Sequence, residues 1–382
     1  MKKVLMMIGA SERHRPFIKR ARELGLHVVG IDRDEEAPGR EYCNVFAPIS
    51  IKDKDRALRF AEEHRIDGCV SIPDEGVPTC AHINSMLGLK GITSDTYNRM
   101  TDKLVAKKHY IDNGVKTPRL GLAMVGFPCI IKPITSTGSS GVLRFDHYAQ
   151  LEHFLGTMRG CPLDFIIEEY IDGWLFSIDL IMQDGEVTYG MLHERYLQYV
   201  SKGCFVDNVI ISPSILDSLL ESLFPVCRKA LLSVGFEDGP ANLQFILSKK
   251  EGSSYLIEIN PRISGPYGIE CHTMATGFEW VDDIINVALG NDVKRFGAIH
   301  DIKPNALITI GSFSSGTLDY LLYPEDPVMF DGLWEWKRKG DTIQRFQRAK
   351  DSIAHVFIME DTFEEVCIRA FGILHNTVVV LK

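Results

Sequence analysis

The chain has 382 residues, of which 45% are hydrophobic and 24% are charged, and its formal net charge is -9. This length allows two or three domains, and the composition is that of an ordinary globular protein rather than a disordered one. The negative charge argues against a broad surface for nucleic acid or anionic membrane, but it leaves room for a local basic pocket.

No segment predicts export or membrane insertion. The apolar stretch in "MKKVLMMIGAS" is short and runs into a charged helical pattern, which favours a first strand over a signal peptide. No run approaches the roughly 18 apolar residues of a membrane helix. The nine cysteines include no C-x-x-C pair and suit reduced thiols. We therefore expect a soluble, cytoplasmic protein.

The first 93 residues alternate strand-like and helical stretches, which predicts a Rossmann-like module. The expected elements are strands over 3–8, 27–32 and 68–72 and helices over 15–24 and 53–65. Asp74 and Glu75 follow the last strand, at the end where open α/β sheets bind ligands, although turn residues or a helix cap explain them equally well.

The residues after the first strand do not favour NAD binding. Gly9 stands alone, because Ser11 and His14 occupy the other two positions of the G-x-G-x-x-G fingerprint. Asp32 does lie about where a ribose-binding acid would be. A Rossmann-like module without the cofactor fits better.

Residues 95–113 predict one helix that ends at Gly114, before Pro118, and connects two domains. Shorter elements follow, and residues 127–190 predict a small α+β unit. The expected elements are a helix around 147–158, a strand within 163–173, a hairpin with an Asp-Gly turn over 176–192, a helix over 214–234 and a second hairpin over 241–262.

The stretch "FPCIIKPITSTGSSGV" places a lysine at the end of an apolar strand and before a loop of small residues. In the P-loop the lysine follows the glycines, whereas Lys132 precedes Gly138 and Gly141. This order disfavours a rigid phosphate cradle. It favours a lysine that leaves a strand and is followed by a mobile flap.

The second hairpin predicts a metal site. Glu258 and Asn260 alternate along one strand and share a face. If the hairpin pairs symmetrically about residue 251, Gln244 lies opposite Glu258 and adds a third oxygen. Such a set suits Mg²⁺, although ordinary exposed strand residues would look the same. Arg262 places a bidentate anion donor beside the predicted metal.

These features together resemble the ATP-grasp family of ligases in order and spacing. They are "TDK" with its lysine at 103, "PCIIKP...GSSGV", the strand "IIEEYI" and the hairpin ending in "EINPR". The resemblance implies a mixed α/β and α+β fold. It places a Rossmann-like module over 1–93, an ATP-grasp domain over 94–295 with a smaller nucleotide-covering part over 127–190, and a small C-terminal α+β domain over 296–382, similar to that of biotin carboxylase.

The resemblance also implies ATP and Mg²⁺ (or Mn²⁺) as cofactors and assigns residue roles. Lys103 also suits a basic helix face, Leu175 or Phe176 stands where many relatives have a ribose-binding glutamate, and Gln244 replaces a frequent glutamate. The implied catalytic residues are Arg262 and Lys132; the nucleotide-binding residues are Lys103, Lys132, Ser136, Thr137, Gly138, Ser139, Ser140, Gly141, Glu168, Glu169, Tyr170 and Ile171; and the metal ligands are Gln244, Glu258 and Asn260.

The implied function is that of an ATP-dependent carboxylate-amine ligase that forms a C–N bond through an acyl phosphate. The alternatives are a carbamoyl-phosphate-synthetase-like protein with another nucleophile and a catalytically silent nucleotide-binding protein. The partners implied are a small carboxylate and an amine, without nucleic acid or membrane, and a homodimer is allowed. The candidate substrate residues, each with a core or salt-bridge alternative, are Glu75, His193, Glu194, Arg195, Ser264 and Gly265, with Arg195 preferred as a carboxylate clamp.

Overall fold

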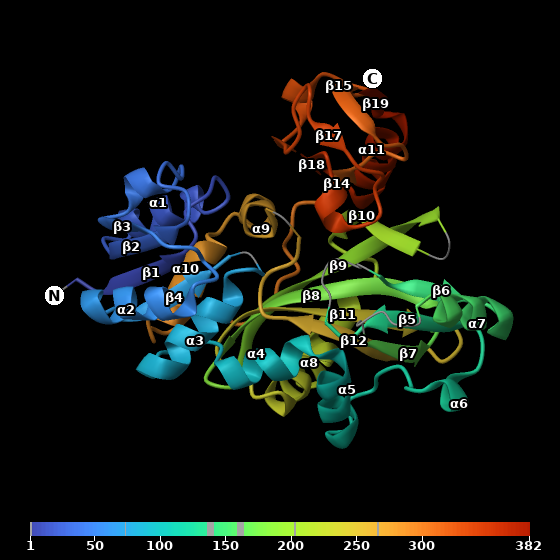
Figure 1. Cartoon of the computed structure of the whole chain (residues 1–382), viewed down its shortest axis with the longest axis horizontal. Coiled ribbons are helices and arrows are strands. Elements are labelled where there is room, and N and C mark those ends of the chain that lie inside the picture. The colour runs from blue at the N-terminus through green and yellow to red at the C-terminus, as the bar shows by residue number, and fades with distance from the viewer. Residues whose placement is uncertain (1, 73, 136–140, 159–163, 202–203, 266) are drawn as a thin grey trace.

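The computed structural model describes residues 2–72, 74–135, 141–158, 164–201, 204–265 and 267–382 (Figure 1). Four β-sheets organise this described part of the chain. In Figure 1 a four-stranded N-terminal sheet lies at the left, a nine-stranded sheet runs through the centre, a small three-stranded sheet lies at the right, and a second three-stranded sheet lies at the top near the C-terminus.

The N-terminal sheet is parallel, with the strand order β3-β2-β1-β4. Its strands read as apolar runs, as expected for a parallel sheet covered on both faces. The predicted Rossmann-like opening is confirmed, whereas β3 and α3 were not predicted. The elements are β1 (Val4–Ile8), α1 (Arg15–Glu23), β2 (His27–Asp32), β3 (Val45–Pro48), α2 (Lys54–His64), β4 (Gly68–Ser71) and α3 (Val77–Leu87).

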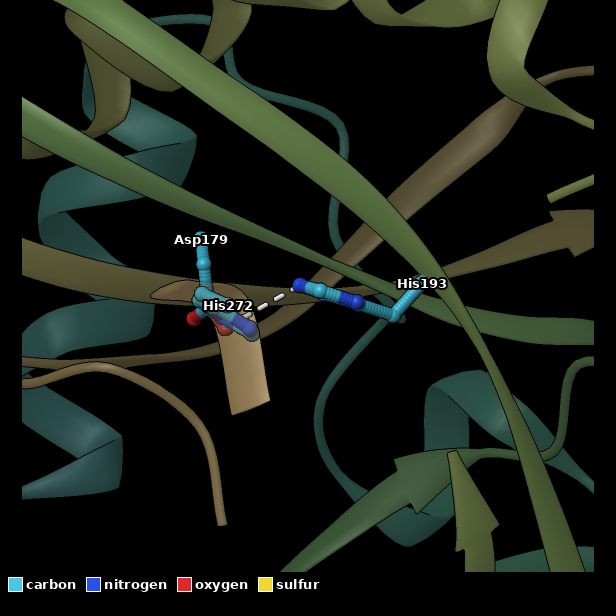
Figure 2. A group of neighbouring side chains, drawn as sticks. All are labelled: Asp179, His193 and His272. Atoms are coloured by element: carbon cyan, nitrogen blue, oxygen red, sulfur yellow. Dashed lines mark hydrogen bonds and ion pairs between the residues drawn. The ribbon is translucent and has the colours of Figure 1, made fainter. Parts of the chain in front are cut away.

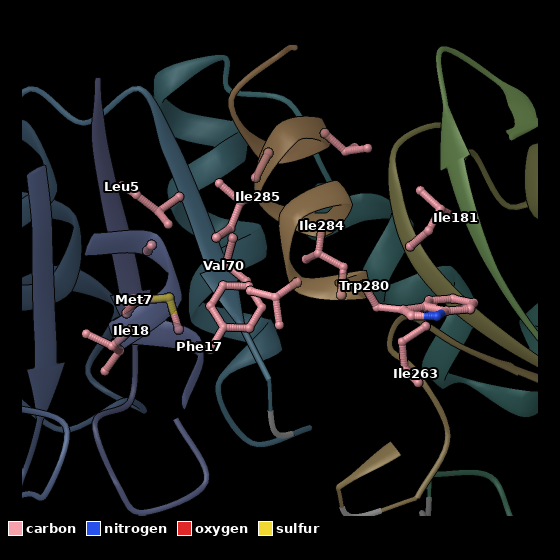
Figure 3. Close-up of a cluster of buried hydrophobic side chains, with 14 of the residues drawn as sticks. Leu5, Met7, Phe17, Ile18, Val70, Ile181, Ile263, Trp280, Ile284 and Ile285 are labelled. Atoms are coloured by element: carbon pink, nitrogen blue, oxygen red, sulfur yellow. The ribbon is translucent and has the colours of Figure 1, made fainter. Parts of the chain in front are cut away.

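A shared hydrophobic core joins the N-terminal sheet to the rest of the chain. Helix α10 (Trp280–Ala288) packs against α1 and β4, and its Trp280 is fully buried (Figure 3). Ile181 of the large sheet and Ile263 reach the same cluster. The N-terminal module is therefore completed by a helix from the far half of the chain, and this core crosses the predicted boundary at residue 93.

The connection between the first two sheets consists of two helices, so the prediction of one helix over 95–113 was wrong. They are α4 (Ser94–Thr101) and α5 (Lys103–Asp112). Between them, Asp102 has an extended backbone and its carboxylate accepts the amides of Leu104 and Val105. The aspartate therefore acts as a helix N-cap, which interrupts an otherwise helical pattern.

The large sheet has the order β12-β11-β8-β9-β10-β14-β18-β16, and β13 pairs with β9. Helix α8 (Leu220–Ser233) packs against β9 and contributes to the core beneath the sheet. It begins later than the predicted 214–234, because a 3₁₀ turn at Asp217–Leu219 precedes it. The strands are β8 (Gly173–Gln183), β9 (Glu186–Ser201), β10 (Cys204–Ser212), β11 (Gly239–Ser248), β12 (Ser254–Asn260), β13 (Gly297–Ala298), β14 (Asn305–Ile310), β16 (Gly332–Glu335) and β18 (Ala354–Met359).

The small sheet is antiparallel and has the order β6-β5-β7. It is shorter in sequence than the predicted unit over 127–190, because β8 and β9 pair with β11 and with each other in the large sheet. The predicted Asp-Gly hairpin turn is confirmed, since Asp184 and Gly185 both have positive φ. The elements of this unit are α6 (Leu122–Val125), β5 (Cys129–Pro133), β6 (Leu143–Phe145), α7 (Tyr148–Thr157) and β7 (Phe165–Glu169).

The C-terminal strands continue the large sheet through the pairing of β10 with β14. A separate sheet of order β17-β15-β19 and helix α11 (Phe363–Asn376) complete this part. Within the described residues, every helix is too short or too polar to cross a bilayer. The three strands of the separate sheet are β15 (Gly316–Leu322), β17 (Thr342–Ile343) and β19 (Val378–Leu381).

A buried histidine in this C-terminal part predicts sensitivity to acid. Burial, reinforced by the charge of Arg13, lowers the pKa of His355 from 6.5 to about 3. Between these two values the unfolded chain binds a proton that the folded chain does not, so this contribution to stability is complete above pH 6.5 and is lost as the pH falls. We expect His355 to account for about 2 kcal/mol of lost stability between pH 7 and pH 5.

Chemical unfolding at the two pH values tests this prediction. The His355→Gln variant should lose about 2 kcal/mol less than the wild type on acidification. The exposed His153, changed to glutamine, serves as the matched control. An equal pH dependence in wild type and His355→Gln would contradict the prediction.

Candidate functional site

Two buried lysines share one glutamate between α5 and the small sheet. Lys132 Nζ lies 2.6 Å from Glu168 Oε2, and Lys107 Nζ lies 3.0 Å from Glu168 Oε1. The three residues are 4%, 1% and 2% exposed in the order Lys132, Lys107 and Glu168. Unpaired charges at this depth would be strongly destabilising, so the pairing holds the cluster together. Two cations and one anion leave a net positive charge for an anionic ligand.

Burial and charge pairing shift the pKa values of Lys107 and Glu168. Burial lowers the pKa of Lys107 to about 8. Burial alone would raise the pKa of Glu168, but the two lysines outweigh it and the net pKa is lowered. Lys107 also donates to Thr117 Oγ1 over 2.6 Å, and Thr117 donates to the carbonyl of Leu256 on β12. The cluster is therefore linked to the second hairpin.

Lys107 was not predicted from the sequence as a site residue. In "KLVAKKHY" it looks like one of several surface lysines. Its spacing in the sequence could have identified it. Lys103, Lys107 and the buried Tyr110 are four and three residues apart, so they lie on one face of α5.

Lys103, the first residue of α5, lies at the exit of β5. Its amide donates to the carbonyl of Ile134 over 3.1 Å. Burial lowers its pKa, and the charges of Glu258, Lys132 and Glu168 act on it. The structure thus brings together the two lysines that were predicted to meet phosphates and places them near a predicted metal ligand.

The predicted flap falls mostly outside the described residues. Its last residue, Gly141, has φ +77°, and a Cβ there would lie 2.8 Å from Pro133 Cγ. Glycine is therefore required where the loop returns to the strand that carries Lys132. The flap residues outside the described part of the chain are Ser136, Thr137, Gly138, Ser139 and Ser140.

The second hairpin has the predicted register, with Gln244 directly opposite Glu258. Asn260 Nδ2 lies 3.4 Å from Glu258 Oε1, so these two side chains share a face. All three residues are partly exposed. One carboxylate and two amides with open access fit a Mg²⁺ ion that keeps waters and takes phosphate oxygens. Metal binding at these residues stays a prediction.

The four residues predicted to contact adenine have different partners in the structure. The Glu168 side chain belongs to the lysine cluster, and Glu169 pairs with Arg119 at 2.7 Å. The amide of Glu169 also donates to the carbonyl of Arg119. Tyr170 and Ile171 follow the end of β7. Their backbone is better placed than that of the two glutamates to contact a base.

The two positions at which the resemblance implied a ribose-binding residue differ in burial. Phe176 is fully buried and stacks on Phe245, with ring centroids 5.4 Å apart. Leu175 alternates with it and is half-buried. Phe176 is therefore unable to contact a nucleotide.

Arg262 pairs with Asp74 of the N-terminal module. Its Nε lies 2.5 Å from Oδ1 and its Nη2 lies 3.2 Å from Oδ2, while Nη1 donates to the carbonyl of Ile263. Desolvation opposes the charge, but Asp74 outweighs it and the pKa of Arg262 is raised. A guanidinium has five N–H donors, and three of them have these partners within the described part of the chain, which leaves two for a ligand. The salt bridge considered from the sequence exists, and a catalytic role stays a prediction.

A pocket lies between Arg262 and the C-terminal end of β4. Gly265 and Glu270 also line it. Burial raises the pKa of Glu270. The pocket thus offers one cation and one carboxyl group. Glu270 was not among the site residues predicted from the sequence.

Two predicted substrate residues are engaged in holding the structure. Glu194 accepts the hydroxyls of Tyr196 and Ser214 and the amide of Ile215, so it anchors the turn after β10. Ser264 binds a buried aspartate through its amide and its hydroxyl. The structure therefore gives both residues a structural task.

The other predicted substrate residues lie at different places. His193 and Arg195 alternate with Glu194 and lie on the opposite face of β9. Glu75 is exposed. Of the predicted substrate residues, Gly265 is the one that lines the pocket beside Arg262.

The fold and the site define a class of protein in which a small antiparallel sheet with a buried lysine lies beside the hairpin of β11 and β12. Residues 100–266 match the family described as ATP-grasp domain, and residues 18–91 match the ATP-grasp N-terminal domain. Together these matches cover more than half of the chain. The chain belongs to the ATP-grasp superfamily, which confirms the resemblance and the fold class predicted from the sequence.

Individual relatives are distant. The large chain of carbamoyl phosphate synthase from Vibrio cholerae is 27% identical over 255 residues, which are 61% of this chain and 22% of that protein. This chain spans about a fifth of that relative. The L-amino acid ligase from Bacillus licheniformis has a TM-score of 0.80 and 20% identity, with 100% of this chain and 99% of that chain covered.

A third comparison concerns the biotin carboxylase domain of the 2-oxoglutarate carboxylase from Hydrogenobacter thermophilus. It has a TM-score of 0.73 and 18% identity, with 100% of this chain and 91% of that chain covered. That structure was solved with MgADP, ADP and bicarbonate. At this level of identity the solved structures show a shared fold.

Glu258 carries the only formal negative charge among the three predicted metal ligands. We expect Glu258→Gln to raise the Mg²⁺ concentration needed for half-maximal nucleotide binding by about tenfold, because an amide is a weaker ligand than a carboxylate. Nucleotide titration at a series of Mg²⁺ concentrations measures the change. Glu251→Gln, at the far end of the same hairpin, is the control. The same Mg²⁺ dependence in Glu258→Gln and wild type would place the metal elsewhere.

Proposed function

We propose that the protein is an ATP-dependent carboxylate-amine ligase. It transfers the γ-phosphoryl group of ATP to a carboxylate, and an amine then displaces phosphate from the acyl phosphate to form a C–N bond. The observation that carries this proposal is the electrostatic neighbourhood of Glu258. The charges of Lys103, Lys107 and Arg262 all interact with this carboxylate, which supports a site where cations for the phosphates lie near a metal ligand.

The proposed roles follow from the charge of each group. The lysine cluster binds the phosphates and offsets their negative charge, and the hairpin oxygens hold Mg²⁺. A bound Mg²⁺ would neutralise charge on the transferred phosphoryl group. The two remaining N–H groups of Arg262 donate to the acyl phosphate as it forms. Phosphoryl transfer needs little covalent help, so positioning and charge neutralisation supply most of the catalysis.

The pocket beside Arg262 supports an amino-acid-like substrate. A guanidinium and the half-buried carboxyl group of Glu270 line the same cavity, and they complement the carboxylate and the ammonium group of an amino acid. The likeness of the whole fold to an L-amino acid ligase is consistent with this substrate class.

A second candidate is a carbamoyl-phosphate-synthetase-like reaction with another nucleophile. Gln244 favours it, because glutamine at this hairpin position resembles the pattern of those synthetases, and the curated relatives carry that name. The two candidates differ in the acid that is phosphorylated, which is an organic carboxylate in one and bicarbonate in the other.

A substrate panel tests the proposal. The purified protein would receive ATP, Mg²⁺, and pairs drawn from amino acids, small organic acids, ammonia and bicarbonate. We expect phosphate release that depends on a carboxylate, a hydroxamate when hydroxylamine replaces the amine, and an amide product by mass spectrometry. Release with bicarbonate alone would favour the second candidate. ATP binding without turnover across the panel would favour a silent nucleotide-binding protein.

A further inference from the structure

Three buried side chains meet between the large sheet and helix α9 (Gly268–Thr276): Asp179 on β8, His193 on β9 and His272 on α9 (Figure 2). The Nε2 atoms of His272 and His193 lie 2.7 Å and 3.1 Å from Asp179 Oδ2. The two imidazole rings stack with centroids 4.7 Å apart. None of the three residues is more than 5% exposed.

More polar groups surround the Asp179 carboxylate than its two oxygens can accept hydrogen bonds from. Its Oδ1 accepts Asn242 Nδ2 at 2.9 Å and the amide of Ser264 at 3.0 Å. Its Oδ2 faces the Nε2 atoms of His193 and His272 and also the hydroxyl of Ser264. A carboxylate has about four acceptor positions, two on each oxygen, so one of the three groups around Oδ2 is in excess.

The excess group is the Nε2 atom of His193. It is buried and, within the described part of the chain, makes no hydrogen bond. The other ring nitrogen of His193, Nδ1, is hydrogen-bonded to Ser212 Oγ at the end of β10. When Nδ1 carries the proton and donates to Ser212, Nε2 presents its lone pair toward Asp179. A partner that fixes the ring in this way is typical of a histidine that binds a metal.

We propose that Asp179, His193 and His272 form a transition-metal site that is separate from the Mg²⁺ site predicted on the hairpin, and that Zn²⁺ is the ion that fits it. Two imidazole nitrogens and one carboxylate oxygen are a frequent zinc ligand set. The three ligand atoms lie within 4.8 Å of one another. Tetrahedral zinc needs about 3.3 Å between ligand atoms, so outward shifts of a few tenths of an ångström admit the ion.

A bound metal would give His193 Nε2 a partner and would give the three side chains a structural role. With the cation between them, both histidines use Nε2 as a lone-pair donor, and neither has to compete for Asp179 Oδ2. The Ser264 hydroxyl, which contacts the same oxygen, supplies the fourth position. Ser264 lies two residues after Arg262, so the metal ties β8, β9 and α9 to the segment that carries the predicted catalytic arginine.

Metal analysis of the full chain tests the site. Protein treated with a chelator would be dialysed against excess Zn²⁺ and then against metal-free buffer, and bound zinc would be measured by elemental analysis. We expect one Zn²⁺ per wild-type chain and, with Co²⁺ instead, the intense visible absorption of a tetrahedral site. Asp179→Asn and His272→Gln should lose both signals. His355→Gln, which changes another buried histidine, should keep them.

A milder variant keeps the test decisive if the ligand variants do not fold. Ser212→Ala retains all three ligands and removes only the hydrogen bond to His193 Nδ1, so zinc affinity should fall about ten- to a hundredfold with an unchanged circular dichroism spectrum. The proposal is overturned if folded wild-type protein takes up neither stoichiometric Zn²⁺ nor tetrahedral Co²⁺. It is also overturned if Ser212→Ala binds Zn²⁺ as tightly as the wild type.

Discussion

The Arg262→Lys variant is expected to form product about a hundred- to a thousandfold more slowly than the wild type while it still binds ATP. Among the described residues, Arg262 donates two N–H groups to Asp74 and one to a main-chain carbonyl, so two of its five N–H groups remain for a ligand. A lysine keeps the charge but offers a single point donor. The lysine ammonium group would therefore not be able to pair with Asp74 and stabilise the charge that develops on the acyl phosphate at the same time.

Asp74 provides an internal check on this prediction. Asp74→Asn removes the charge that holds the guanidinium, so it should reproduce part of the loss in rate. Arg228→Lys, at an exposed ion pair with Glu186, is the matched control. Hydroxylamine trapping of the activated acid, together with the rate of product formation, would be compared in all variants. Equal trapping and equal rates in Arg262→Lys and wild type would remove Arg262 from the chemistry.

Changing Lys132 to methionine is expected to raise the dissociation constant of ATP about ten- to a hundredfold, because a charge-assisted hydrogen bond to a phosphate is lost. The structure adds a cost in stability that was not expected from the sequence. Lys132 is buried and paired with Glu168, so its removal leaves that carboxylate with Lys107 alone. Breaking a buried pair in this way is strongly destabilising.

A double variant separates the two effects of Lys132. Lys132→Met with Glu168→Gln removes both charges, and Lys107, whose pKa is already lowered to about 8, can then release its proton. We expect this variant to recover stability but not ATP affinity. Calorimetric ATP titration and melting curves measure the two quantities, with the exposed Lys108→Met as control. Unchanged ATP affinity in a folded Lys132→Met protein would show that Lys132 does not bind the phosphates.

The sequence by itself determined the features that depend on local geometry. The period of two in a strand placed Glu258 and Asn260 on one face, and the short hairpin set Gln244 opposite Glu258, as the structure confirms. The order of lysine before glycine excluded a P-loop and identified Lys132 as a residue at the end of a strand. These inferences span at most about 20 residues, a range over which backbone periodicity and turn chemistry decide the outcome.

Only the tertiary structure decided which distant groups meet. In the sequence Lys107 resembles a surface lysine, but in the fold it pairs with Glu168 on β7. Arg262 pairs with Asp74, which follows β4 of the N-terminal sheet. The pattern over 176–192 predicted a hairpin with an Asp-Gly turn, but it did not specify that its first strand, β8, would pair with β11. Distant strands and buried charges pair through surfaces that exist only in the folded chain. Periodicity along the sequence therefore does not predict which of them pair.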